Sequence, residues 1–292
     1  MHWQTARFLI DLRRPQVMGI VNTTPDSFSD GGQFSDAEAA MAFCERLLAE
    51  GADLLDIGGE STRPGARSPG LAEEVARVLP VLRHAVSLGV PVSVDTSRPE
   101  LMQAALDLGV DILNDVRALA RPGALAVAAA HPRCGVCLMH MQGEPGSMQQ
   151  APAYDGDGVQ AVARWLAQRR DEVLAAGIGR QRIVLDPGIG FGKTPDHNWA
   201  LLQRQAELSA LGQPLLVGWS RKSTLGALTG RPVEQRLVPS VAAALACVQR
   251  GARVLRVHDV AATVDALKVW RAAGLGAPAD FLSQQSQGTG TP

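Results

Sequence analysis

The sequence predicts a (β/α)8 TIM barrel, an α/β fold formed here by a single chain of 292 residues. Eight short apolar runs recur along the chain, and each is followed by a loop and a segment of helical character. Polar residues stand directly after these runs, where a barrel of parallel strands places its active site. The chain length suits one such barrel.

The eight apolar runs are expected to be the barrel strands. Short and nearly continuous apolar runs are typical of parallel strands that are buried on both faces. We expect these strands at residues 17–21, 54–57, 90–94, 111–113, 135–139, 183–185, 215–217 and 254–257.

The segments between the runs predict helices, because their apolar residues recur every three or four positions. Examples are residues 37–49, 72–88, 159–175 and 234–249. Glycines that can end a helix in the left-handed conformation follow several helical segments: Gly51, Gly89, Gly109, Gly177 and Gly251. An open doubly wound sheet is the main alternative fold. It normally carries a Gly-x-Gly-x-x-Gly turn after its first strand, and residues 22–32 lack that pattern.

The two ends of the chain are expected to differ from the barrel body. Residues 8–10 form another apolar stretch, which predicts a short strand or hairpin that closes the barrel bottom. We expect one barrel domain over residues 1–276. Residues 277–292 are polar and low in complexity, which predicts a disordered tail.

The composition argues against large charged partners. The chain is 46% hydrophobic and 20% charged, and its 28 Lys+Arg against 29 Asp+Glu give a formal net charge of −1. Neither a nucleic acid nor an anionic membrane is therefore expected as a partner. Residues 1–14 lack the features of a signal peptide, and no apolar run is long enough to span a bilayer. A cytoplasmic location is expected.

Two motifs suggest other chemistry but lack the residues that it needs. Cys134 and Cys137 form a CxxC, yet no second CxxC or HxxxH completes a zinc site, and Cys137 lies within an apolar run. Residues 188–194 resemble a nucleotide-binding P-loop, but Pro187 stands where that motif requires glycine. Neither a redox or metal site nor a nucleotide triphosphatase is expected.

The residues after the apolar runs form a predicted ring at the C-terminal face of the barrel. An isolated Asp or Asn at such a junction is as often a helix cap as a functional residue. A whole set of acids, bases and amides is not needed for barrel stability, so the set predicts an active site. Its members are Asn22, residues 58–65, Asp95, Asn114, His140, residues 186–193, residues 220–223, Arg256 and His258.

The chemistry of the ring predicts a flat heterocycle that carries a diphosphate. Carboxylates of Asp95 and Asp186, with the amide of Asn114, suit the donor edge of an aminopyrimidinone. Asn22 can give an oxygen to Mg²⁺, which also takes phosphate oxygens. Phe191, flanked by glycines, suits the wall of an aromatic-substrate pocket. The cationic or potentially cationic residues that suit a diphosphate are Arg63, Arg221, Lys222, Arg256 and His258.

These segments together resemble the dihydropteroate synthase family of pterin-binding barrels. The matching segments occur in family order from residue 17 to about residue 275. The two most specific are Met18-Gly-Ile-Val-Asn-Thr-Thr-Pro-Asp-Ser-Phe-Ser-Asp-Gly-Gly32 and Asp56-Ile-Gly-Gly-Glu-Ser-Thr-Arg-Pro-Gly65. The others are residues 93–96, 114–116, 139–143, 186–193, 220–223 and 257–260.

The resemblance implies a role for each ring residue. The pterin pocket matches Asp95, Asn114, Asp186 and Lys222, with Met139 and Arg221 as further substrate contacts. The diphosphate side matches Asn22 as the Mg²⁺ ligand, Thr62, Arg63, His258 and Arg256, which also flanks the pterin ring. The p-aminobenzoate side matches Pro64, Phe191 and Ser220, with Thr62 also facing the amine. The residues expected to act in catalysis are Asp30, Arg63, Lys222, Arg256 and His258.

The implied reaction replaces the diphosphate of 6-hydroxymethyl-7,8-dihydropterin diphosphate with p-aminobenzoate and gives 7,8-dihydropteroate. It follows an SN1-like path assisted by Mg²⁺, in which Asp30 stabilises a cationic pterin. The resemblance also implies a folate-pathway enzyme, a sulfonamide target and a homodimer. The apolar face of residues 239–248 is a candidate dimer contact, but it is equally consistent with a helix that packs on the barrel. Two alternatives stay open: a methyltransferase that uses methyltetrahydrofolate, and a catalytically silent pterin-binding paralogue.

Overall fold

Eight parallel strands close into a barrel, as the sequence predicts. The computed structural model describes residues 1–24, 33–60, 69–144, 146–149 and 152–275. The order around the barrel is β10-β3-β4-β5-β6-β7-β8-β9, so the first and last barrel strands pair with each other. The barrel strands are β3 (Gln16–Asn22), β4 (Leu54–Gly58), β5 (Val92–Asp95), β6 (Ile112–Asp115), β7 (Gly135–Met139), β8 (Ile183–Asp186), β9 (Leu215–Val217) and β10 (Ala252–Val257).

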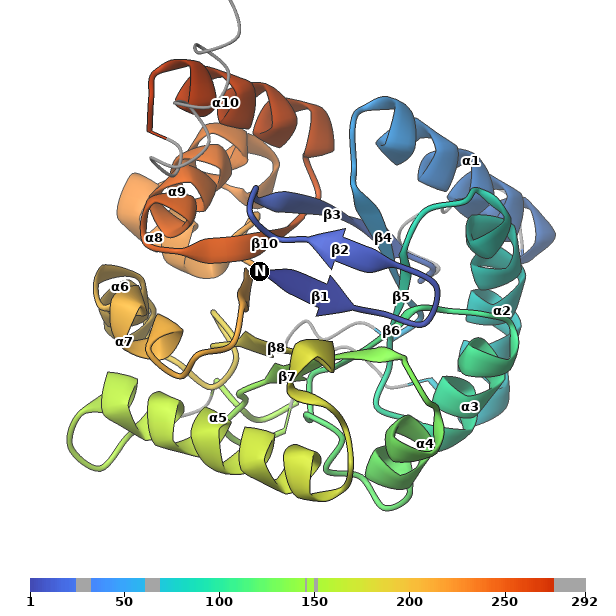
Figure 1. The fold of residues 1–292 in the computed structure, drawn as a ribbon. Helices are drawn as coiled ribbons and strands as arrows, with labels where there is room; N and C mark the ends of the chain where they lie inside the picture. The colour runs from blue at the N-terminus through green and yellow to red at the C-terminus, as the bar shows by residue number, and fades with distance from the viewer. Residues whose placement is uncertain (25–32, 61–68, 145, 150–151, 276–292) are drawn as a thin grey trace, which may run out of the picture.

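Helices surround the barrel on its outside (Figure 1). They are α1 (Gln33–Ala49), α2 (Leu71–Ser87), α3 (Pro99–Asp107), α4 (Ala124–Ala130), α5 (Gly158–Ala175), α6 (Pro195–Gln203), α7 (Gln205–Ser209), α8 (Ser223–Thr229), α9 (Leu237–Gln249) and α10 (Val260–Ala272). Short 3-10 helices lie at Arg180–Arg182 and Val233–Gln235. The five glycines expected after helices all have positive φ, from +74° at Gly89 to +98° at Gly51.

Two apolar clusters hold these layers together. The larger lies between the strands and the helices, and the smaller fills the barrel interior with residues such as Met18, Leu54 and Val184. Because strand side chains alternate between the two faces, every barrel strand contributes to both clusters or to the polar ring above them.

An N-terminal hairpin closes the bottom of the barrel, as expected from residues 8–10. Strand β1 (His2–Gln4) pairs antiparallel with β2 (Leu9–Asp11), and the hairpin lies across the end of the barrel that faces the viewer in Figure 1. Trp3 is fully buried in the interior cluster, and its indole Nε1 donates to the carbonyl of Arg182 at 2.9 Å. The hairpin therefore seals the interior opposite the predicted active site.

The expected helix over residues 234–249 is divided in the structure. A 3-10 turn at Val233–Gln235 precedes α9, and Arg236 caps the helix with φ −91° and ψ 14°. Pro239 explains the break. Because proline has no N–H to donate, it is best tolerated in the first turn, so the helix begins just before it.

The inner face of α9 packs on the barrel, where Ala243, Ala244 and Cys247 are buried. Large apolar side chains that remain exposed lie near its start, namely Leu237 and Val238. Among the described residues, none of the helices combines the length and apolar character that a membrane span requires. The tail expected at residues 277–292 lies outside the described residues.

Candidate active site

The polar ring expected at the strand ends is present among the described residues. Asn22, Asp95 and Asp186 are each the last residue of their strand, and Asn114 is the last but one of β6. Arg256 projects from β10, and Met139 ends β7 beside Asp186 in the strand register. The C-terminal ends of the strands thus bring together residues that lie far apart in the sequence.

Arg256 joins the ring carboxylate of Asp95 to the carboxylate of Asp56. Its Nε donates to Asp56 Oδ2 at 2.6 Å, and its Nη2 donates to Asp95 Oδ2 at 2.7 Å. Burial raises the pKa of Asp95 to about 7, although the charge of Arg256 opposes the shift. Burial therefore outweighs the neighbouring cation in setting the direction of this shift.

Asp56 lies one layer below the ring, and the sequence pattern did not assign it to the site. Its side chain is fully buried, and Oδ2 accepts from Asn114 Nδ2 at 3.1 Å as well as from Arg256. A signal was available in the sequence, because an aspartate interrupts the apolar strand Leu54–Gly58. Charged residues are almost never fully buried unless they are paired.

Asp186 is held by the glycine-rich turn that follows it. Its Oδ1 accepts from the backbone N–H of Gly188 at 2.7 Å, and burial raises the pKa of the carboxyl. Gly188 has φ +68°, and a Cβ there would lie 1.9 Å from the carbonyl oxygen of His140. Only glycine allows this turn to pass so close to the end of β7.

His140, a member of the ring predicted from the sequence, contacts a buried lysine. Lys193 Nζ lies 2.9 Å from His140 Nδ1 and donates to the carbonyls of His140 and Phe191 at 3.2 and 3.0 Å. Burial lowers the pKa of Lys193 to about 7 and that of His140 to about 3. The lysine thus ties the turn that carries Phe191 to the end of β7.

Lys222 and Phe191 form one wall of the site. Lys222 Nζ lies 4.2 Å from the centre of the Phe191 ring, a cation–π contact. Burial lowers the pKa of Lys222 to about 8, although the charge of Asp186 opposes the shift. The aromatic wall expected at Phe191 therefore stands beside an amine that contacts the ring face.

Ser220 contacts His258. Ser220 Oγ accepts from the backbone N–H of His258 at 3.1 Å and lies 3.0 Å from its Nδ1. Burial lowers the pKa of His258 to about 3, with Arg256 and Arg221 acting in the same direction. The ring is therefore neutral, and donation from the Ser220 hydroxyl to Nδ1 would leave Nε2 with its proton.

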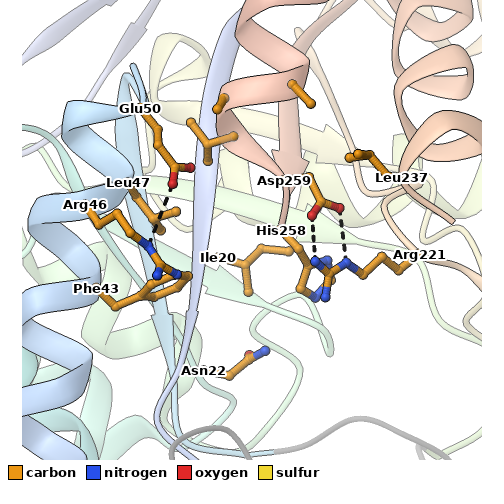
Figure 2. A pocket seen from close by; sticks show the side chains of 13 residues that line it. Ile20, Asn22, Phe43, Arg46, Leu47, Glu50, Arg221, Leu237, His258 and Asp259 are labelled. Carbon is orange, nitrogen blue, oxygen red and sulfur yellow. Dashed lines mark hydrogen bonds and ion pairs between the residues drawn. The ribbon is translucent and has the colours of Figure 1, made fainter. Parts of the chain in front are cut away.

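A pocket of about 560 Å³ lies beside the ring, between β3, α1 and α10 (Figure 2). Asn22 and His258 line it, together with Val260, Ala261 and Ala262 from the first turn of α10. Unpaired backbone N–H groups at the start of a helix favour anions.

Figure 2 also shows that Arg221 pairs with Asp259, with Nη2 to Oδ1 at 2.6 Å. Arg221 therefore lies on the pocket wall, and its guanidinium is already paired.

Four predicted residues lie outside the described residues, namely Asp30, Thr62, Arg63 and Pro64. The cysteines of the CxxC are both buried free thiols. Cys134 Sγ accepts from Arg182 Nη2 at 3.2 Å, and Cys137 belongs to the barrel interior. Within the described part of the chain, no group of three or more His, Cys, Asp or Glu side chains could hold a metal ion.

Fold and site together define a barrel enzyme whose acceptor-rich ring adjoins a pocket lined by Asn22, His258 and the first turn of α10. The model of the family described as "Pterin binding enzyme" matches residues 18–258. The dihydropteroate synthase of Neisseria meningitidis serogroup B is 56% identical, and the match covers 94% of this chain and 98% of that protein. The chain therefore belongs to the dihydropteroate synthase family of pterin-binding enzymes.

Solved structures support the same family. Dihydropteroate synthase from Xanthomonas albilineans in complex with 7,8-dihydropteroate is 49% identical with a TM-score of 0.86, and the match covers 94% of this chain and 99% of that one. Dihydropteroate synthase from Yersinia pestis in a sulfonamide drug complex is 45% identical with a TM-score of 0.88, with the same coverage of both chains. These relatives favour a synthase over the methyltransferase alternative.

Proposed function

We propose that the chain joins 6-hydroxymethyl-7,8-dihydropterin diphosphate to p-aminobenzoate, giving 7,8-dihydropteroate and diphosphate. The observation that carries this proposal is the ring of Asp95, Asn114 and Asp186 beside the pocket of Asn22 and His258. One part offers acceptors to a flat donor edge, and the other suits an anion. A pterin diphosphate needs both surfaces at once.

Recognition of the pterin would rest on buried acids. Asp186 is held rigidly by Gly188, so its carboxylate can meet a planar N–H edge without reorganisation. Asn114 and Lys222 would contact neighbouring atoms of the heterocycle, and Met139 would line the pocket beside Asp186. Burial makes each such hydrogen bond stronger than it would be in water.

Departure of the diphosphate is the difficult step, because an aryl amine is a weak nucleophile. We infer that the bond between the pterin methylene carbon and the diphosphate oxygen breaks first, and that the oxygen keeps the electron pair. Arg63, Arg256 and His258 would stabilise the developing negative charge, and Asp30 the cationic pterin. The amine nitrogen then bonds to the methylene carbon and releases a proton.

Mg²⁺ is the proposed cofactor on this side of the site. Asn22 offers an amide oxygen in the pocket beside His258, and Mg²⁺ commonly takes few protein ligands and completes its shell with phosphate oxygens and waters. A single amide beside an anion-binding helix start fits that donor set. When bound, Mg²⁺ would neutralise charge on the leaving diphosphate.

The amine would enter beside Phe191. Its ring, fixed by Lys222 on one face, suits contact with the benzene ring of p-aminobenzoate. Ser220 would lie at this side of the mouth, with Thr62 and Pro64. The sulfonamide complex of the Yersinia pestis relative supports inhibition of this chain by sulfonamides.

We also infer that the enzyme is a homodimer. Four exposed apolar side chains cluster in sequence around α8 and the start of α9, and we term them the α8–α9 patch: Leu228, Val233, Leu237 and Val238. Their exposed fractions range from 41 to 76%, and exposed large apolar side chains such as these suit burial in a protein interface. A cytoplasmic location is proposed, in keeping with four cysteines that are buried free thiols.

The deciding experiment incubates the purified chain with the pterin diphosphate, p-aminobenzoate and Mg²⁺ and measures dihydropteroate. Product is expected, and Asp186→Ala should give none because it removes the carboxylate that meets the pterin edge. Pterin binding without product from the wild-type chain would instead indicate a catalytically silent paralogue. Calorimetry with the pterin diphosphate alone separates these two outcomes.

A further inference from the structure

Asp56 lies inside the barrel, one layer below the ring. Strand side chains alternate, so Asp56 shares the inner face of β4 with Leu54, which belongs to the apolar interior cluster. In the register of the barrel, Asp56 lies opposite Ser93 of β5, and Gly58 lies opposite Asp95. A fully buried carboxylate therefore stands beneath the surface on which the pterin is proposed to bind.

The contacts of Asp56 reach across strands that do not pair with its own. Strand β4 pairs with β3 and β5, whereas Arg256 comes from β10 and Asn114 from β6. Both side chains donate to the same oxygen, Oδ2, at 2.6 and 3.1 Å. Asp56 thus links the two sides of a five-strand arc through the barrel interior.

The hydrogen bond to Asn114 fixes which way its amide faces. A carboxylate accepts only, so the Asn114 NH2 group must face Asp56. The carbonyl oxygen of Asn114 is then directed to the other side of the amide. Without Asp56, rotation of the amide by half a turn would present a donor where the site now offers an acceptor.

The contact between Asp56 and Arg256 determines how the guanidinium is shared between Asp56 and Asp95. Arg256 is divided between Asp56 and Asp95, and both bonds are short and charge-assisted. The charge of Asp56 also adds to the burial that raises the pKa of Asp95 to about 7. Other charged groups near Asp95 are Asp115 at the end of β6, Glu60 after β4 and Lys222 after β9.

We propose that Asp56 is a positioning residue for pterin recognition, which holds Arg256 in place and keeps the carbonyl of Asn114 turned toward the ligand. The proposal rests on the function proposed above and adds a residue to it. It predicts that a change at Asp56 affects the pterin and leaves p-aminobenzoate recognition at Phe191 largely intact.

The main test compares Asp56→Asn with Ser93→Ala. Asparagine keeps the shape but removes the charge, so the affinity for pterin diphosphate in calorimetry should fall by roughly tenfold or more. The KM for p-aminobenzoate should stay within about twofold of wild type, since its proposed contacts are elsewhere. Ser93 is equally buried in the same layer, and its Oγ makes no hydrogen bond to the described residues, so Ser93→Ala should bind the pterin like wild type.

The pH dependence of pterin binding gives a readout that a purely structural role would not move. In wild type, affinity should fall as the pH drops through about 7, where Asp95 gains its proton. Loss of the negative charge at Asp56 lowers the pKa of Asp95, so this loss of affinity should begin at lower pH in Asp56→Asn. Asp56→Glu keeps the charge but displaces the carboxylate, and should therefore lose affinity while retaining the wild-type pH dependence.

Two results would overturn the inference. One is wild-type pterin affinity and pH dependence in Asp56→Asn. The other is an equal loss for both substrates in Asp56→Asn and Asp56→Glu with an unchanged pH dependence, which indicates general damage to the fold. Absence of product from the wild-type chain would refute the proposed function, so failure of that function is distinguishable from failure of the inference.

Discussion

Two basic residues at the barrel mouth, the partly buried Arg256 and the buried Lys193, have opposite surroundings. Arg256 lies between the carboxylates of Asp56 and Asp95, so its charge is balanced. Lys193 has only neutral acceptors, namely the ring nitrogen of His140 and two backbone carbonyls. Burial therefore lowers the pKa of Lys193 from 10.5 to about 7. Folding disfavours the protonated form of this lysine.

The sign of the resulting pH effect on stability can be tested with Lys193→Met. Between pH 7 and pH 10.5 the unfolded chain keeps the lysine proton and the folded chain loses it, so this residue makes stability rise with pH. The stability of Lys193→Met relative to wild type should thus be most favourable near pH 7 and should decline toward pH 10. Urea unfolding of both proteins at several pH values measures this difference in the free energy of unfolding.

Lys268→Met is the matched control for that series. Lys268 is exposed on α10 and pairs with Asp265, so its replacement should leave the pH dependence of stability as in wild type. A constant stability difference between Lys193→Met and wild type from pH 7 to pH 10 would contradict a lowered pKa for Lys193 in the folded chain.

At the scale of elements, the turn between β8 and α6 has the tightest backbone constraint of the site. It passes against the end of β7, where Gly188 lies against the carbonyl of His140. The same turn supplies the N–H that holds Asp186 and the ring of Phe191. Its geometry therefore links the two surfaces proposed to bind the pterin and the amine.

Gly188→Ala should lower the free energy of unfolding by about 3 kcal/mol or more, since it adds both a steric clash and left-handed strain. Gly177→Ala is the control, because Gly177 has φ +93° but open space where a Cβ would lie. That control should lose only about 1 kcal/mol, the cost of the left-handed conformation. Denaturant unfolding of both variants checks the difference, and equal losses would contradict a steric role for His140.

The strands and helices could be predicted because each element carries a local signal. Buried parallel strands read as apolar runs, and glycine with positive φ ends helices. The division of residues 234–249 could also have been predicted, because Pro239 disfavours a longer helix. Some strand ends differ by one or two residues from those predicted. Strand β5, predicted at residues 90–94, is Val92–Asp95, because the polar Asp95 continues the strand pairing.

The candidate site was predictable in its residues at the strand ends and less so in its interior. Positions such as Asp95 and Asp186 follow apolar runs, so local order reveals them. The roles of Asp56, Lys193 and His140 depend on side chains that meet across the barrel, which sequence spacing does not encode. The pairing of Ser220 with His258 arises in the same way, from β9 and β10 lying side by side.

At the scale of the whole molecule, the α8–α9 patch is the surface proposed for dimer formation. Val238 is 76% exposed, and a charge there would oppose burial against a second copy. Val238→Asp should therefore be a monomer in light scattering at concentrations where the wild type is a dimer. Val269→Asp alters a similarly exposed valine, 69% exposed on α10, and should remain a dimer. A dimeric Val238→Asp would place the interface elsewhere.

The pairing of β10 with β3 has a consequence for synthesis on the ribosome. The barrel cannot close until residues near 257 have left the exit tunnel, although β3 begins at residue 16. At about 5–20 residues per second, this delay amounts to roughly ten seconds to a minute. Because Arg256 and His258 belong to the final strand and the residue after it, a nascent chain completes the polar ring only after residue 258 has been synthesised.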